Sequence, residues 1–93
     1  MEKTYQRSDD VVLRDIAGET FLIPIRGDIA DLRRIYSLDP VGRFVWERMD
    51  RPATLKSLSE ALVDAYDVDR PTAEADVREF AAGLVEASLA REL

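Results

Sequence analysis

An Asp-Pro step in the stretch IYSLDPVGRFVWERMD, residues 35–50, constrains the fold more than any other local feature. The residues before the step have the β-branched and aromatic character of a strand, whereas apolar residues recur at helical spacing after it. Asp39 can accept hydrogen bonds from the free N–H groups of a first helical turn, and Pro40 fits the first helical position because no donor is needed there. The step therefore predicts that a strand ends and a helix begins at Asp39 and Pro40.

Three extended segments are predicted upstream of that step. The runs VVLRDI (11–16) and TFLIPI (20–25) flank a turn that contains glycine, which is typical of a β-hairpin. Pro24 has no backbone N–H group, so we expect strand pairing to be interrupted there. The run LRRIYSL (32–38) is the third predicted strand. Residues 1–10 are polar and have neither a strand nor a helix period, so we expect them to form a flexible arm.

Three amphipathic helices are predicted downstream of the step. RPA at 51–53 ends the first helix, Thr54 can cap the second, and Asp69 or Arg70 precedes the third. Strands that precede helices along the chain predict an α+β fold, here a three-stranded antiparallel sheet followed by a three-helix bundle that is winged-helix-like. The expected apolar residues are Val41, Phe44, Val45, Trp46 and Met49 in the first helix, Leu55, Leu58, Leu62, Ala65 and Tyr66 in the second, and Ala73, Val77, Phe80, Ala81, Leu84 and Val85 in the third, with Leu89 folding back to the core.

Two missing residue types narrow the chemistry of this chain. It contains no cysteine and no histidine, which removes thiol nucleophiles, thiolate zinc sites and the side chain best suited to proton transfer near neutral pH. Its four glycines stand alone, without the pattern of a phosphate-binding loop. We therefore expect a protein that is not an enzyme and that uses no metal and no cofactor.

The acidic residues are better explained by helix capping than by metal binding or catalysis. Asp64, Asp67 and Asp69 are close in sequence, but the segment lacks the glycine of a calcium loop, and Pro71 opens a helix within it. Carboxylates in turns and at helix starts cap free N–H groups and complement the helix dipole. The net charge of -6 favours a basic ligand over nucleic acid or an anionic lipid surface.

The expected location is the cytoplasm, with no membrane partner. The first fifteen residues, MEKTYQRSDDVVLRD, contain charges throughout and no apolar segment of the secretory kind. No run in the sequence approaches the roughly 18 apolar residues of a spanning helix.

A winged-helix-like fold raises a DNA-binding transcription regulator as an alternative function, since such domains can bind DNA through a third helix. Residues 71–93 contain five acidic and two basic residues, a net charge of -3. Phosphates repel a helix of this charge, so we expect no nucleic-acid partner. A gel shift that weakens steeply with salt would identify this alternative.

An interaction surface is predicted at the third strand. Arg33 and Arg34 are an adjacent basic pair, and they lie close to Tyr36 in a segment that can form a sheet edge. Charged residues on an edge often serve only to prevent aggregation. The same edge could instead accept an extended peptide through backbone hydrogen bonds, with neighbouring pockets reading its side chains.

Gly42 and Gly83 stand inside predicted helices, where glycine costs about 1 kcal/mol relative to alanine. Such a glycine usually marks a close contact. Two interpretations stay open, namely tight helix packing and the floor of a shallow groove.

Three segments together resemble the PqqD-like family of peptide chaperones. They are IYSLDPVGRFVWERMD, TLKSLSEALVDAYDVD and AEADVREFAAGLVEASL, and the resemblance spans about 35–89. The residues that carry the family pattern are Leu38, Asp39, Gly42, Trp46, Met49 and Asp50. Arg51-Pro52 departs from the pattern, because the family usually turns on glycine at this point.

The resemblance implies a RiPP recognition element, a single winged-helix-like domain over residues 11–93 that binds the leader of a ribosomally made precursor peptide. Such proteins act in pyrroloquinoline quinone biosynthesis and related pathways and present the precursor to a modifying enzyme, often a radical SAM protein. The leader adds as a strand to the third strand and packs against the third helix. An exposed third strand could also pair with its own copy in a homodimer. Carried over by position, the peptide-binding residues are Arg33, Arg34, Ile35, Tyr36, Ser37, Asp76, Val77, Phe80 and Gly83, although apolar spacing favours a core position for Val77.

Overall fold

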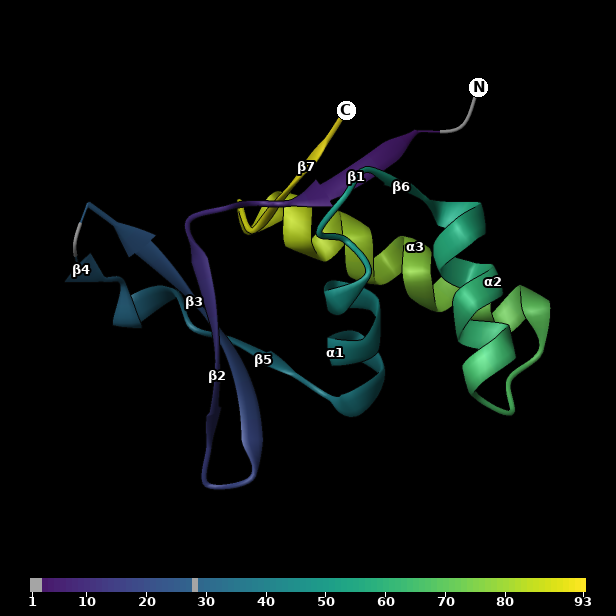
Figure 1. The fold of residues 1–93 in the computed structure, drawn as a ribbon, viewed down its shortest axis with the longest axis horizontal. Coiled ribbons are helices and arrows are strands. Elements are labelled where there is room, and N and C mark those ends of the chain that lie inside the picture. The colour runs from purple at the N-terminus through teal and green to yellow at the C-terminus, as the bar shows by residue number, and fades with distance from the viewer. Residues whose placement is uncertain (1–2, 28) are drawn as a thin grey trace.

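The computed structural model describes residues 3–27 and 29–93 and contains a main sheet, a small second sheet and three helices (Figure 1). This α+β architecture with antiparallel sheets confirms the predicted fold class. In chain order the elements are β1 (Thr4–Arg7), β2 (Val11–Ile16), β3 (Glu19–Arg26), β4 (Ile29–Ala30), the 3-10 helix η1 (Leu32–Arg34), β5 (Tyr36–Leu38), α1 (Pro40–Glu47), β6 (Ala53–Thr54), α2 (Leu55–Ala65), α3 (Arg70–Glu86) and β7 (Ala90–Glu92).

The predicted hairpin is confirmed as β2 and β3, which pair along their whole shared length from Val11 opposite Pro24 to Ile16 opposite Glu19. The two-residue turn consists of Ala17 and Gly18, both with positive φ, at 53° and 83°. Positive φ at both central positions is the geometry that matches the twist of the flanking strands. The sequence therefore places its glycine where the turn needs one.

The tip of this hairpin is fastened to α1 by a charged contact. The Thr20 hydroxyl donates to Asp15 Oδ1 at 2.7 Å, and Arg43 Nη1 of α1 donates to the same oxygen at 2.7 Å. The hydrogen bond from Thr20, followed by that from Arg43, lowers the pKa of Asp15 below its ordinary value. The contact joins the hairpin to the first helix, and because both side chains are more than a third exposed it contributes little to stability.

The opposite side of β3 pairs with two short strands. Residues 20–22 pair with β5 and residues 25–26 with β4, so Pro24 falls in the gap between the two pairings. The predicted interruption at Pro24 is confirmed on this edge only, because Pro24 pairs with Val11 of β2 on the other edge. The prediction of a strand over 32–38 is wrong in its first half, because residues 32–34 form a 3-10 helix and only 36–38 pair. The Asp31 side chain accepts a hydrogen bond from the N–H of Arg33 and so caps a helical turn, which excludes an extended backbone there.

All three helices begin where their caps were predicted. Asp39 accepts the N–H of Gly42 at 2.7 Å, and Thr54 and Ser57 form a reciprocal capping box. Asp69 accepts the N–H of Thr72 at 3.0 Å, and hydrogen bonding from Thr72 lowers the pKa of Asp69. No helix within the described ranges is long and apolar enough to cross a membrane.

A second sheet of order β6-β1-β7 corrects the prediction of a flexible arm over residues 1–10. Residues 1–2 lie outside the described ranges, but Thr4–Arg7 form a strand between β6 and β7, with Tyr5 buried. The Tyr5 hydroxyl donates to Glu92 at 3.2 Å, and burial is the main cause of a raised pKa for Tyr5. The N–H of Arg7 also donates to the Met49 carbonyl at 2.9 Å. Backbone pairing with two distant segments therefore orders residues whose own sequence has no strand period.

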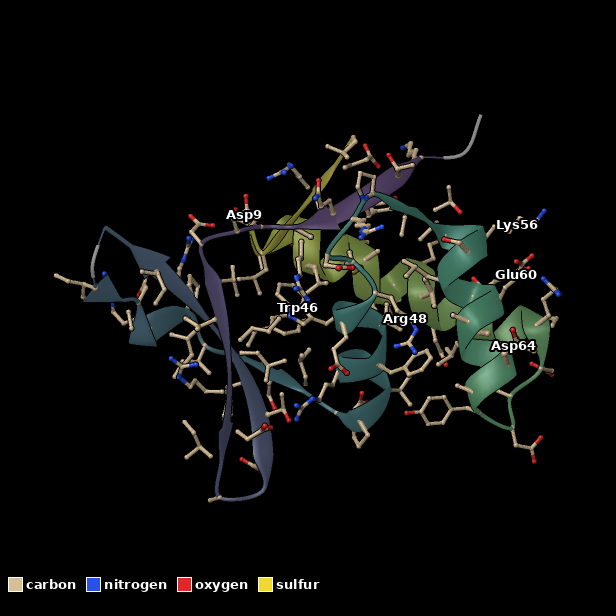
Figure 2. The ribbon with its side chains drawn as sticks, viewed as in Figure 1. Asp9, Trp46, Arg48, Lys56, Glu60 and Asp64 are labelled. Carbon is tan, nitrogen blue, oxygen red and sulfur yellow. The ribbon has the colours of Figure 1, made fainter. Side chains whose placement is uncertain are left out.

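The core joins the main sheet to the helices through fully buried side chains, among them Leu22, Met49, Leu62 and Leu84. Leu89 is also buried, which confirms that the chain folds back after α3. Figure 2 shows Trp46 on the side of α1 that faces the hairpin, whereas Lys56, Glu60 and Asp64 project from the outer side of α2. Ala65 and Tyr66 were expected on the apolar face of α2 but are exposed, since this helix ends at Ala65.

Candidate functional site

The outer edge of β5 has no strand partner among residues 3–27 and 29–93. β5 pairs with β3 along one edge only, through Thr20 to Leu38, Phe21 to Ser37 and Leu22 to Tyr36. The flanking residues Ile35 and Asp39 are extended as well, at ψ values of 132° and 173°. Extended backbone therefore runs from residue 35 to 39, and the peptide groups of β5 on the side away from β3 are unpaired within the described residues, whereas the Asp39 carbonyl already accepts the N–H of Arg43 at 2.9 Å.

A cavity of about 400 Å³ lies beside this strand, between β5, the start of α1 and one face of α3. Val41, Val45, Val77 and Phe80 give it apolar walls. Its volume lies near the lower end of the range of ligand-binding pockets, and one or two side chains of an entering chain would fit in it. Its lining residues are Tyr36, Asp39, Val41, Gly42, Val45, Leu62, Asp76, Val77, Glu79 and Phe80.

Both helical glycines lie at close contacts beside this cavity, as their positions predicted. A Cβ atom at Gly42 would approach Asp39 Oδ1 and Phe80 Cε1 at 3.2 Å each and Leu38 Cδ2 at 3.4 Å. A Cβ atom at Gly83 would meet the Tyr36 hydroxyl at 3.2 Å. The absence of side chains at these two positions lets α3 approach both β5 and the start of α1, which supports the packing interpretation.

The cavity is acidic at its rim. Asp39, Asp76 and Glu79 line it, and no lysine or arginine does. The Asp39 carboxylate is already bound to the N–H of Gly42. Asp76 and Glu79 are exposed, and neither forms an ion pair or a hydrogen bond through its side chain within the described part of the chain.

The structure brings together only some of the residues predicted to bind a peptide. Tyr36, Asp76, Val77 and Phe80 line the cavity, and Gly83 adjoins the Tyr36 hydroxyl. Val77 is only 1% exposed and also belongs to the core, as its spacing favoured. Ser37 is exposed on β5, and Ile35, which precedes this strand, is 44% exposed.

Arg33 and Arg34 were placed on the strand and are instead on the 3-10 helix before it. The Arg33 side chain is 95% exposed and makes a long ion pair of 3.8 Å with Asp31. Arg34 lines a different cavity of about 240 Å³, together with Asp10 and the residues that follow α3. Neither arginine can therefore contribute strand pairing, although both lie near one end of β5.

Six residues that line the cavity were not among those predicted from the sequence to bind a peptide. Glu79 could have been found from helical spacing, because it follows Asp76 by three positions and therefore shares its face of α3. Val41, Val45 and Leu62 were interpreted as core, Asp39 was interpreted only as a helix cap, and Gly42 was considered as a possible groove floor but not assigned to the peptide site. The missed residues are Asp39, Val41, Gly42, Val45, Leu62 and Glu79.

No arrangement for metal chemistry is found in residues 3–27 and 29–93, where no three acidic side chains gather as metal ligands would. The strongest geometric feature is instead a free strand edge beside an apolar, acid-rimmed cavity. These features define a winged-helix-like domain that offers a sheet edge and a helix face to an extended chain.

The comparison with protein families identifies the group to which this domain belongs. A family model described as Coenzyme PQQ synthesis protein D (PqqD) matches residues 19–90. The match covers most of the sequence, and the chain therefore belongs to the PqqD family. No curated protein sequence matches this chain significantly.

Two solved structures share the fold. One is described as TbiB1 in complex with the TbiA(beta) leader peptide; it is 29% identical, has a TM-score of 0.71, and the similarity covers 92% of this chain and 94% of the other. The second is the PqqD truncation of Methylobacterium extorquens PqqCD, described as a functional and stand-alone RiPP recognition element. It is 22% identical, has a TM-score of 0.72, and the similarity covers 95% of this chain and 88% of the other.

Proposed function

We propose that this chain binds the leader segment of a ribosomally made precursor peptide and presents it to a modifying enzyme, such as a radical SAM protein, in the cytoplasm. In this proposal residues 11–93, together with the preceding strand β1, act as one docking domain and perform no chemistry themselves. The leader would lie as an additional strand along the free edge of β5, with apolar side chains entering the cavity beside α3.

The observation that carries the proposal is the free edge of β5 next to that cavity. Within the extended residues 35–39, the peptide groups of β5 that point away from β3 have no partner among the described residues, and hydrogen bonds to such groups contribute roughly 0.5–1.5 kcal/mol each. Strand addition supplies affinity through the backbone, and a neighbouring pocket supplies selectivity for particular side chains. After the cost of ordering the peptide, we expect a dissociation constant on the order of micromolar.

The comparisons support this proposal. Membership of the PqqD family agrees with it, and the TbiB1 structure contains a leader peptide. The chain also lacks cysteine and histidine, so the proposal leaves the reaction itself to a partner.

The DNA-binding alternative finds less support. α3 carries Glu74, Asp76, Glu79 and Glu86 against Arg70 and Arg78, and phosphates would repel this surface. A second copy of the chain is another candidate occupant of the β5 edge. In that case the peptide and the second copy would compete, and adding peptide would convert a dimer to a monomer.

Titration calorimetry with leader peptides encoded beside this gene tests the proposal. We expect saturable binding of one peptide per chain, and loss of binding when proline replaces a residue in the strand-forming segment, because proline lacks the N–H that the pairing needs. Proline placed outside that segment is the matched control and should leave the affinity unchanged. Absence of heat for every leader, together with unchanged NMR signals of residues 36–38, would contradict the proposal.

The partner is tested separately. If the chain presents its leader to an enzyme, the rate of precursor modification should rise when the chain is added and should not rise with a precursor that carries the strand-segment proline. A rate that is independent of the chain would contradict presentation while leaving leader binding intact.

A further inference from the structure

The cavity beside β5 has an excess of negative charge, and this excess favours a particular kind of leader. Three of its ten lining residues are acidic and none is basic. The neighbouring cavity near the start of β5 contains one acid and one base, Asp10 and Arg34. Of these two cavities, only the one that Asp39 lines has an excess of negative charge.

The carboxylates of Asp76 and Glu79 have no cationic partner within the described residues. Arg78 lies between them in sequence, but around the helix it is about 200° from Asp76 and about 100° from Glu79, and it does not line the cavity. The nearest arginine on α1, Arg43, is held by Asp15 at 2.7 Å. A bound cation would therefore be the first partner for these two carboxylates.

The same turn of α3 provides the apolar wall and the two carboxylates. Glu79 follows Asp76 by three positions and Phe80 follows Asp76 by four. This spacing places all three side chains on neighbouring parts of one helix face. On an added strand, side chains two positions apart share a face and lie about 7 Å apart. A peptide residue whose apolar side chain contacts Phe80 thus has a neighbour within reach of the carboxylates.

We infer that the leader recognised by this chain carries a lysine or arginine within two residues of the apolar side chain that enters the cavity, and that Asp76 and Glu79 bind this cation. The inference rests on the proposed function and adds the class of leader to it. The aliphatic stem of lysine or arginine can cover the apolar wall while its charged group reaches the rim. Peptide binding also displaces water there, which strengthens the attraction between the charges.

Selection from a displayed library of random 12-residue peptides tests this inference without knowledge of the natural leader. The bait would be the full chain, in three forms: unchanged, Asp76→Asn with Glu79→Gln, and Glu74→Gln with Glu86→Gln. The last form is the matched control, because it removes the same charge from exposed positions of α3 that do not line the cavity. Unchanged thermal midpoints would verify that all three forms fold alike.

We expect the unchanged chain and the control to enrich peptides with a basic residue within two positions of a large apolar one. The cavity variant should lose this enrichment. For one selected peptide, fluorescence anisotropy at low salt should give about tenfold weaker binding to the cavity variant, which corresponds to about 1.4 kcal/mol. The affinity for the control should change by less than about twofold. High salt should reduce the difference in affinity between the unchanged chain and the cavity variant, because salt screens the charges.

The possible failures separate the inference from the proposed function. Peptides that shift NMR signals of β5 but show no basic enrichment, or equal enrichment on the cavity variant, overturn the inference and leave leader binding standing. A selection that yields no peptide bound at β5 overturns both.

Discussion

The same substitution, glycine to alanine, should have opposite effects on stability at the two helical glycines, Gly42 and Gly83. Replacing glycine by alanine inside a helix contributes about 1 kcal/mol of helix propensity. At Gly83 the new methyl group would meet a single atom, the Tyr36 hydroxyl at 3.2 Å. This hydroxyl is the end of a half-buried side chain and can shift by a few tenths of an ångström. We therefore expect Gly83→Ala to stabilise the fold by about 0.5–1 kcal/mol.

At Gly42 the methyl group would meet three atoms, two of them at 3.2 Å. The two atoms at 3.2 Å belong to the Asp39 carboxylate, which is held by its capping hydrogen bond, and to the half-buried ring of Phe80; the third, at 3.4 Å, belongs to the largely buried side chain of Leu38. Overpacking of this kind costs about 1–3 kcal/mol, which exceeds the propensity gain. We expect Gly42→Ala to destabilise the fold by about 1 kcal/mol, so that the two variants differ by about 2 kcal/mol.

Urea unfolding monitored by the fluorescence of Trp46 measures this difference, since Trp46 is the only tryptophan and is buried. For a domain of this size 1 kcal/mol shifts the melting temperature by about 4–8 °C, so the two variants should melt roughly 10 °C apart. The unchanged chain should melt between them. If both variants shift in the same direction by similar amounts, the contacts around Gly42 do not determine its effect and the packing argument is refuted.

Three further predictions concern capping, the second sheet and pH. Asp39→Ala should lower the free energy of unfolding by about 1 kcal/mol through loss of the cap of α1, as measured by urea unfolding, whereas Asp39→Asn should retain most of it. Tyr5→Ala should lower the free energy of unfolding by about 3 kcal/mol, because the Tyr5 side chain of β1 is buried in the second sheet. An unchanged melting temperature would instead support the original prediction that residues 1–10 form a flexible arm. The hydrogen bonds from Thr72 lower the pKa of Asp69 below 3.8, so the stability that this cap contributes is present above about pH 4 and is lost as pH falls through the folded-state pKa. An NMR titration of the Asp69 carboxyl with a midpoint above 3.8 would contradict this sign.

The helices and the hairpin could be predicted because their signals are local. Asp39, Thr54 and Asp69 each cap the helix that follows them in sequence, and Gly18 lies in the two-residue turn that joins β2 and β3. A cap or a tight turn involves residues only a few positions apart. The sequence therefore contains the whole cause of each feature.

The second sheet could not be predicted because its cause is not local. β1, β6 and β7 have only two to four residues each, too few to show a strand period. Their partners are far apart in sequence, with Tyr5 opposite both Ala53 and Glu92. Such pairing depends on the helices first bringing these segments together.

The candidate site was predictable on the strand and on α3 but not on α1. Phe80 was assigned to the site by the family resemblance, since its spacing alone indicated a core position; Gly83 was assigned by the resemblance and by its place inside a helix, and Tyr36 by its place in a predicted edge strand. Arg33 and Arg34 were misplaced because the cap provided by Asp31 competes with extended backbone. Val41 and Val45 were assigned to the core by their apolar spacing, and spacing alone cannot distinguish a core residue from one that also lines a cavity.

Amide hydrogen exchange of Tyr36–Leu38 in the presence and absence of a bound leader peptide tests the central claim most directly. Strand addition at the free edge of β5 predicts that amides of this segment become strongly protected when the peptide binds, while the hairpin residues 11–16 keep their exchange rates. Protection confined to α3 or to the hairpin, with unchanged exchange across Tyr36–Leu38, would contradict it.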